Sequence, residues 1–132
     1  MSEYFWVAIG GALGSVGRFW FSGIVARHLG ETFPWGTLLV NISGSFVIGL
    51  FAALTGPDGR WLLPPWFRQQ FFIYGVCGGY TTFSSFSLQT LNLIEEGEWL
   101  YAGGNIVFSV ICCLLAVWLG HLVATNINAP PR

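Results

Sequence analysis

Long apolar stretches without a charged side chain dominate the chain. Three of them run from Thr32 to Pro57, from Gln69 to Ile94 and from Trp99 to Pro131, and each exceeds the ~20 residues with which a helix crosses a bilayer. A fourth, Tyr4 to Gly17, reaches that length only by continuing through Arg18. We therefore predict one domain over residues 1–132 with four transmembrane helices, at about residues 4–27, 35–54, 67–94 and 99–123.

The third predicted helix is longer than a bilayer requires. Its 26 uncharged residues, Gln69 to Ile94, would form a helix of about 39 Å at the standard rise, whereas the hydrocarbon layer is about 30 Å thick. Near its middle, Gly78 and Gly79 are followed by threonines and serines, a sequence that favours a break. Non-helical backbone at membrane depth is tolerated only where protein covers it or where it lines a cavity. We expect this break to be functional.

Composition places the chain in the membrane and excludes one class of partner. Hydrophobic residues make up 54% of the chain and charged residues 8%, against about a quarter charged in an average soluble domain. The basic residues are five arginines without a lysine, and the formal net charge is -1. The basic stripe that nucleic acid binding requires is therefore missing. We expect the lipid bilayer, and no nucleic acid, as a partner.

The arginines give little preference for either orientation in the membrane. With a cytoplasmic N-terminus, Arg60, Arg68 and Arg132 would lie on the cytoplasmic side. Arg27 would lie on the opposite side, together with Arg18 if it reaches that far. Because the asymmetry of Lys and Arg in short loops sets orientation, a bias this weak allows insertion both ways. The sequence is therefore compatible with an antiparallel homodimer.

Asn41 is a primary amide about one third of the way along the second predicted helix. Its two N–H donors are costly in hydrocarbon unless an acceptor is present. The side chain could form an interhelical hydrogen bond that holds the bundle together, or it could donate to a ligand in the membrane. The position of Asn41 favours neither alternative.

Five hydroxyls and two aromatic rings follow the expected break. A single serine or threonine in a membrane helix usually bonds to its own i-4 carbonyl or permits close helix packing, but a cluster beside a break favours a polar track. Phe83 and Phe86 lie three residues apart on one helix face. Such a pair normally packs, yet an aromatic edge carries partial positive charge and can face an anion. The hydroxyls belong to Thr81, Thr82, Ser84, Ser85 and Ser87.

Several chemistries are missing from the predicted helices. No aspartate, glutamate or lysine lies deep in any of them, so the buried carboxylate of a proton-coupled transporter is absent. No nucleophile–base pair is recognisable, and neither the three cysteines nor the two histidines have metal-ligand spacing. We therefore expect no enzyme. The remaining groups are hydroxyls, an amide, aromatic edges, open backbone and Arg18, and they suit a small anion that accepts strong hydrogen bonds.

Three motifs in these helices resemble those of the Fluc fluoride channels, also called the CrcB family, and the resemblance covers essentially the full length of the chain. The first helix carries Gly10-x-x-x-Gly14-x-x-x-Arg18, and the second carries Gly36-Thr37-Leu38-x-Val40-Asn41. The third carries Gly78-Gly79-Tyr80-Thr81-Thr82-Phe83-Ser84-Ser85-Phe86-Ser87. All three match the family in order and spacing.

The resemblance implies a fluoride-selective channel in the cell (inner) membrane that exports cytoplasmic fluoride passively and relieves its toxicity. It implies an antiparallel, dual-topology homodimer with two pores and a central structural sodium ion (Na+). By motif position, the sodium ligands would be the backbone carbonyls of Gly78 and Thr81, and Arg18 would lie toward the wide vestibule. The residues implied in the fluoride pore are Asn41, Thr82, Phe83, Ser84, Ser85, Phe86 and Ser109.

Two positions depart from the family pattern. Gln89 stands where family members often carry a glutamate, which removes a negative charge from the anion path and could alter the rate of conduction without altering selectivity. Cys112 and Cys113 stand where a Gly–Ser pair is common in the family. Only their side-chain volume gives a physical account of them.

Two other functions remain open. A small multidrug transporter is also four-helical and dual-topology, but it should carry a glutamate inside the first helix, where this chain has only Glu3 at the membrane edge. A membrane assembly subunit without transport activity is the second alternative.

Overall fold

The structure is a computed structural model that describes residues 1–130, and in that part of the chain every regular element is a helix. The predicted all-helical class is confirmed for these residues. Arg132, which enters the argument on orientation, lies outside the described residues. The elements are α1 (Ser2–Leu29), α2 (Trp35–Leu54), η1 (Trp66–Cys77), α3 (Gly78–Tyr80), α4 (Phe83–Glu95) and α5 (Trp99–Asn128).

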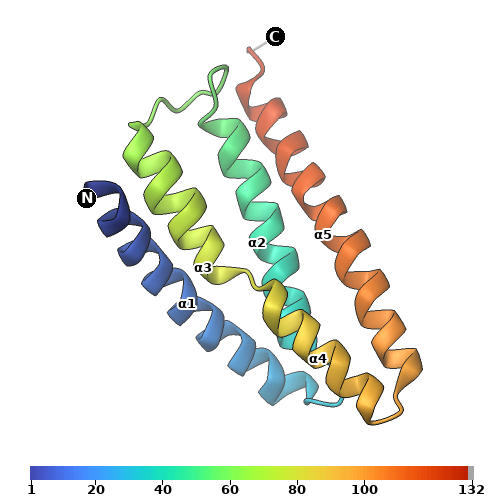
Figure 1. The fold of residues 1–132 in the computed structure, drawn as a ribbon. Coiled ribbons are helices and arrows are strands. Elements are labelled where there is room, and N and C mark those ends of the chain that lie inside the picture. The colour runs from blue at the N-terminus through green and yellow to red at the C-terminus, as the bar shows by residue number, and fades with distance from the viewer. Residues whose placement is uncertain (131–132) are drawn as a thin grey trace.

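These elements form four rods that run up and down, the third of which is interrupted between α3 and α4 (Figure 1). Because the rods alternate in direction, the N-terminus, the end of α5 and the longer loop after α2, residues 55–65, lie at one end of the molecule (Figure 1). The loops after α1 and after α4 lie at the other end (Figure 1). α1 packs mainly against η1, and α2 mainly against α5. Past the interruption, the third rod leaves α1 and packs against α5.

Two of the helices extend beyond the predicted bounds, because polar side chains stabilise turns outside the apolar stretches. α1 carries Glu3 in its first turn and Arg27 in its last, and each of these charges complements the helix dipole. In the last turns of α5, Thr125 and Asn126 bond to the carbonyl of Leu122. α2 has the predicted bounds, Trp35–Leu54.

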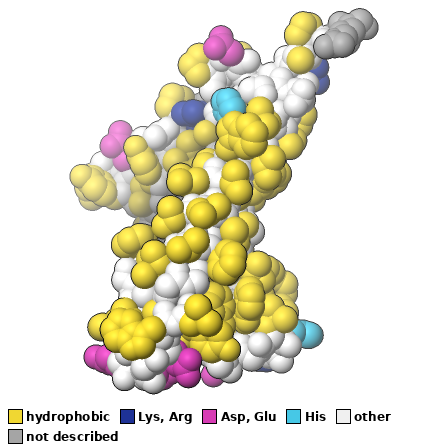
Figure 2. Space-filling model, turned by 90° about the vertical axis from the view of Figure 1, so that its right-hand side faces the viewer, with side chains coloured by type: hydrophobic (Ala, Val, Ile, Leu, Met, Phe, Trp, Pro, Cys, Tyr) yellow, Lys and Arg dark blue, Asp and Glu magenta, His cyan; other side chains and the backbone are white. Residues whose placement is uncertain are grey.

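α2 and α5 are long and apolar enough to cross a bilayer, with mean hydropathies of 2.0 and 2.5. The core helix of a soluble protein can pass the same test, but it hides its large side chains. On α5, by contrast, Phe108, Ile111, Leu114 and Trp118 are each more than half exposed. Figure 2 shows hydrophobic side chains covering the middle of this face, with charged groups toward its two ends. The chain is a membrane protein.

Glycines allow α1 and η1 to approach until their backbones touch. A Cβ atom added at Gly14 would collide with the carbonyl oxygen of Val76 and would lie 2.7 Å from the backbone nitrogen of Tyr80. A Cβ at Gly10 would likewise collide with the carbonyl oxygen of Phe71. Small residues that bring backbones together are the usual device of membrane helix packing. The contact fixes α1 directly beside the segment that leads into the break.

This close approach makes Gly14 sensitive to a single added methyl group. We expect Gly14→Ala to destabilise the fold by about 1–3 kcal/mol, because the backbones must move apart. The matched control is Gly11→Ala on the same helix, where nothing lies within 4 Å of the added Cβ. Thermal unfolding of the purified protein in detergent measures the difference. Equal stability of the two variants would contradict the packing argument.

Candidate functional site

The break in the third rod falls at Thr81 and Thr82. Both have extended backbones, with φ -79° and ψ 156° at Thr81 and φ -151° and ψ 115° at Thr82. The glycines that were expected to cause the break remain helical: Gly78 has φ -65° and ψ -36°. Gly79 is needed for packing instead, because a Cβ there would lie 2.5 Å from the carbonyl oxygen of Gly11. The break itself lies at the two threonines, whose β-branched side chains favour extended backbone.

Asn41 of α2 holds the broken backbone by a pair of hydrogen bonds. Its Nδ2 donates to the Thr82 carbonyl oxygen at 2.9 Å, and its Oδ1 accepts from the Thr82 backbone N–H at 2.8 Å. Asn41 therefore makes the interhelical bond that was one of its two expected roles. Its amide has two N–H groups, and only one is used among the described residues. The second remains for another acceptor.

The Thr82 hydroxyl starts α4. Its Oγ1 accepts from the Ser85 backbone N–H at 3.2 Å, which is the bond that an N-cap side chain makes. The same Oγ1 lies 3.1 Å from Ser85 Oγ and 3.3 Å from Ser84 Oγ. Three of the predicted pore hydroxyls are thus joined in one cluster immediately after the break.

The backbone carbonyls of residues 78 to 81 lose their helical donors at the break, and Gly78 and Thr81 are two of them. In a continuous helix the Gly78 carbonyl would accept from the Thr82 N–H, and the Thr81 carbonyl from the Ser85 N–H. The Thr82 N–H donates to Asn41 instead, and the Ser85 N–H donates to the Thr82 hydroxyl. Oxygen atoms freed in this way are the ligands that hard cations prefer. The Gly78 and Thr81 carbonyls, which the family resemblance implies as sodium ligands, are among those that the break frees, whereas the Gly79 carbonyl accepts from the Ser15 hydroxyl.

A cavity of about 400 Å³, lined mainly by residues with polar side chains, lies beside the break between α1, α2 and α4. Two of its buried polar atoms, Arg18 Nε and Gln89 Oε1, have no hydrogen-bond partner. A buried polar atom without a partner is costly, so both atoms favour a polar guest in the cavity. The lining residues are Ser15, Arg18, Phe19, Ser22, Thr37, Thr82, Ser85 and Gln89.

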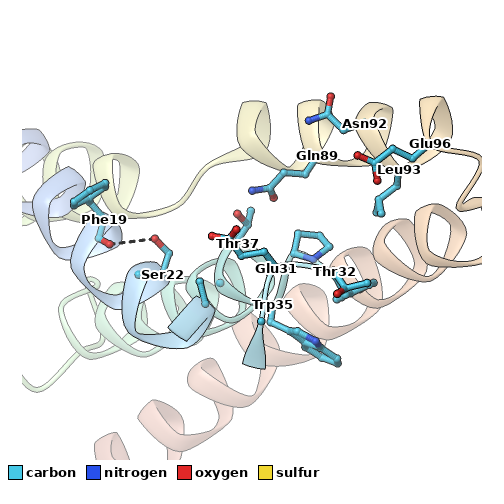
Figure 3. Close-up of a pocket in the computed structure, with 16 residues that line it drawn as sticks. Phe19, Ser22, Glu31, Thr32, Trp35, Thr37, Gln89, Asn92, Leu93 and Glu96 are labelled. Atoms are coloured by element: carbon cyan, nitrogen blue, oxygen red, sulfur yellow. Dashed lines mark hydrogen bonds between the residues drawn. The ribbon is translucent and has the colours of Figure 1, made fainter. Parts of the chain in front are cut away.

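A second cavity, of about 390 Å³, shares four lining residues with the first and therefore adjoins it. It opens among the loops that follow α1 and α4 and has Glu31 and Glu96 in its wall. In Figure 3, Gln89 and Asn92 of α4, and Glu96 immediately after it, lie above Thr37 and Glu31. The cavity near the loops thus has carboxylates in its wall, whereas the adjoining cavity beside the break has Arg18.

The two predicted pore aromatics lie outside both cavities. The rings of Phe83 and Phe86 have centroids 5.3 Å apart at an angle of 50°. Phe83 is 78% exposed at the start of α4. A large apolar ring in that position has no cover within its own chain.

Ser109 is buried on α5, away from the cavity beside the break, and its hydroxyl lies 3.4 Å from Asn105 Oδ1. Asn105 is a further amide within the membrane-spanning stretches, and it was not among the residues expected in the site. The signal was available, because an amide inside a long apolar run is as costly at position 105 as at position 41. Ser15, Ser22 and Thr37 were missed as cavity residues for a different reason, since single hydroxyls on separate helices form no pattern in the sequence.

Comparison with known proteins assigns the chain to a family. The family model described as CrcB-like protein, Camphor Resistance (CrcB), matches residues 5–121. A protein of Opitutus terrae named fluoride-specific ion channel FluC is 62% identical over 129 residues, which cover 98% of this chain and 97% of that protein. A protein of the same name from Rhodospirillum rubrum is 63% identical over 125 residues, or 95% of this chain and 96% of that protein. The chain therefore belongs to the CrcB family.

Proposed function

We propose that this protein is a fluoride-selective channel, not an enzyme, and that it exports cytoplasmic fluoride passively. The observation that carries the proposal is its 62–63% identity, over nearly the whole chain, to proteins named fluoride-specific ion channel. The cavity beside the break supports it, because Arg18 and the hydroxyls of Thr37 and Ser85 can supply donors there. Fluoride is a small anion that accepts strong hydrogen bonds, and these donors can replace its water.

The working unit that we propose is an antiparallel homodimer in the inner membrane, with each chain crossing the bilayer four times. The exposure of Phe83 supports a partner subunit, which would cover this ring beside Phe86. In such a dimer the ring edges would face fluoride, while the second N–H of Asn41 would donate to it. Two equivalent pores follow from the two-fold symmetry.

The break supports a structural sodium ion at the centre of this dimer. The carbonyls of Gly78 and Thr81 lack their helical donors, and Gly78 is exposed on the surface of the chain. Two such carbonyls from each subunit would supply four oxygen ligands. The ion would compensate their dipoles and hold the two breaks together.

Ion efflux from liposomes tests the proposed function. Purified protein reconstituted into liposomes loaded with potassium fluoride should release fluoride at least about a hundredfold faster than matched liposomes release chloride, which corresponds to about 2.7 kcal/mol of discrimination. Liposomes without protein give the background. Equal efflux rates for the two anions would contradict the proposed selectivity. Efflux no faster than background would contradict the proposal that the protein is a channel.

Removal of sodium tests the metal site separately. Dialysis into sodium-free potassium buffer should silence fluoride efflux or weaken the dimer, and returning sodium should restore both. Size-exclusion chromatography follows the dimer while an electrode follows fluoride. Potassium at equal ionic strength is the control for screening. Unchanged efflux and an unchanged dimer after dialysis would count against the site at Gly78 and Thr81.

A further inference from the structure

Asn105 of α5 lies at the centre of a buried chain of hydrogen bonds and is only 1% exposed. Its Nδ2 donates to Thr90 Oγ1 at 2.9 Å, and Thr90 Oγ1 donates to the carbonyl of Phe86 at 2.8 Å. On its other side, Asn105 Oδ1 accepts from Ser109 Oγ at 3.4 Å. The chain of bonds connects Ser109 on α5 to the backbone of Phe86 on α4.

The hydrogen bonds of this chain run in one consistent direction. Thr90 has one hydroxyl proton, which is used on the Phe86 carbonyl, so its oxygen accepts from Asn105. The amide of Asn105 is thereby oriented with Nδ2 toward Thr90 and Oδ1 toward Ser109. Ser109 offers its proton to Asn105 over 3.4 Å, near the outer limit for a hydrogen bond. That weak bond leaves the Ser109 proton available to a stronger acceptor.

The same bonds fix the position of α4, which has few other attachments. The N-terminal end of α4 is tied to α2 through Asn41 and Thr82. Along its length α4 packs mainly on α5, and within residues 1–130 the bond from Asn105 to Thr90 is the one side-chain hydrogen bond between these two helices. A rotation of α4 that turns Phe86 must break this bond, because Thr90 lies one turn further along the same face.

We infer that Asn105 is a positioning residue of the pore. It sets the rotation of α4, and with it the ring of Phe86, and it keeps the Ser109 hydroxyl ready to donate. The inference rests on the proposed fluoride channel and adds a residue that acts through Thr90 and Ser109. Asn105 itself stays buried behind them.

Paired substitutions test this assignment in the full-length protein. Asn105→Leu and Thr90→Val each remove the bond with little change in volume, and each should lower fluoride efflux from liposomes about tenfold, as expected for the loss of one hydrogen bond within the membrane. Thr90→Ser keeps the hydroxyl and should retain efflux within about twofold. The double variant Asn105→Leu/Thr90→Val should be no slower than the slower single variant, because both remove the same bond.

Matched controls separate positioning from folding. Asn126→Leu and Thr125→Val make the same chemical changes at exposed sites of α5, where the side chains bond only to their own helix, and both should conduct normally. Rates are compared per folded dimer after size-exclusion chromatography. If folded Asn105→Leu conducts at the unaltered rate, or if Thr90→Val equals Thr90→Ser, the assignment is overturned. Should Asn105→Leu fail to fold, the comparison at Thr90 decides the question.

A spectroscopic measurement tests the geometry independently of conduction. With 4-fluorophenylalanine placed at position 86, the ¹⁹F resonance should shift or broaden in Thr90→Val relative to the unaltered protein. In Thr90→Ser it should keep the position that it has in the unaltered protein. An unchanged resonance in Thr90→Val would contradict the proposed hold on the ring. If the unaltered protein released no fluoride but the resonance moved as expected, the proposed function would fail while the link between Asn105 and Phe86 would stand.

Discussion

Phe83→Ile and Phe86→Ile should each abolish fluoride efflux from liposomes, with a loss of at least about a hundredfold, while the dimer stays intact. Isoleucine keeps the apolar bulk of the ring but lacks the partial positive charge of an aromatic edge. A fluoride ion between the two rings would then meet methyl groups, which cannot replace the water it has shed. The loss of the edge thus raises the barrier for the anion without disturbing the helices around it.

This experiment has two controls, a measurement of the dimer and a matched substitution of another phenylalanine. Phe83 is 78% exposed within its own chain, so size-exclusion chromatography must show that the isoleucine variants still form dimers. Phe5→Ile makes the same change at an exposed ring on the first turns of α1 and should leave efflux unchanged. If both pore variants released fluoride at the unaltered rate, the aromatic edges would have no part in conduction.

The helices were predictable from the sequence because lipid imposes a simple condition on length. Charge-free runs long enough to span a bilayer place α2 and α5, and α2 begins and ends where predicted. The third rod was also expected to break, since its length exceeds the bilayer. The exact position of the break was not predictable. It depends on which backbone N–H groups find a side-chain acceptor, and the Asn41 oxygen that takes the Thr82 N–H lies 41 positions away in the sequence.

The hydroxyl cluster of the candidate site was predictable because its residues are close in sequence. Thr82, Ser84 and Ser85 follow one another and form one cluster. The remaining hydroxyls of the cavity come from α1 and α2, and only the packing of these helices brings them to α4. Arg18 shows the same limit. From the sequence, this charge must lie either near one end of the first helix or in a wet cavity. Only the three-dimensional structure shows that its Nε lacks a partner and that Arg18 lines the same cavity as Gln89.

Asn41→Leu should also abolish fluoride efflux, and it should destabilise the fold as well. Leucine removes both partners of Thr82, which leaves a backbone N–H and a carbonyl unpaired at membrane depth. Each unpaired group costs about 1–3 kcal/mol, and non-helical backbone in a membrane survives only where its polar groups are satisfied. The extended residues at the break would then rearrange, and the carbonyls of Gly78 and Thr81 would regain helical donors.

This rearrangement gives Asn41→Leu a signature that Phe83→Ile lacks. Because the proposed sodium ligands depend on the break, Asn41→Leu should lose its response to sodium, whereas Phe83→Ile should keep the proposed sodium-dependent dimer. Asn126→Leu removes an exposed amide that bonds only to its own helix and should match the unaltered protein in both assays. Thermal unfolding with and without sodium measures the difference. A sodium-stabilised Asn41→Leu dimer would mean that the break persists without its amide, and Asn41 would then act on fluoride alone.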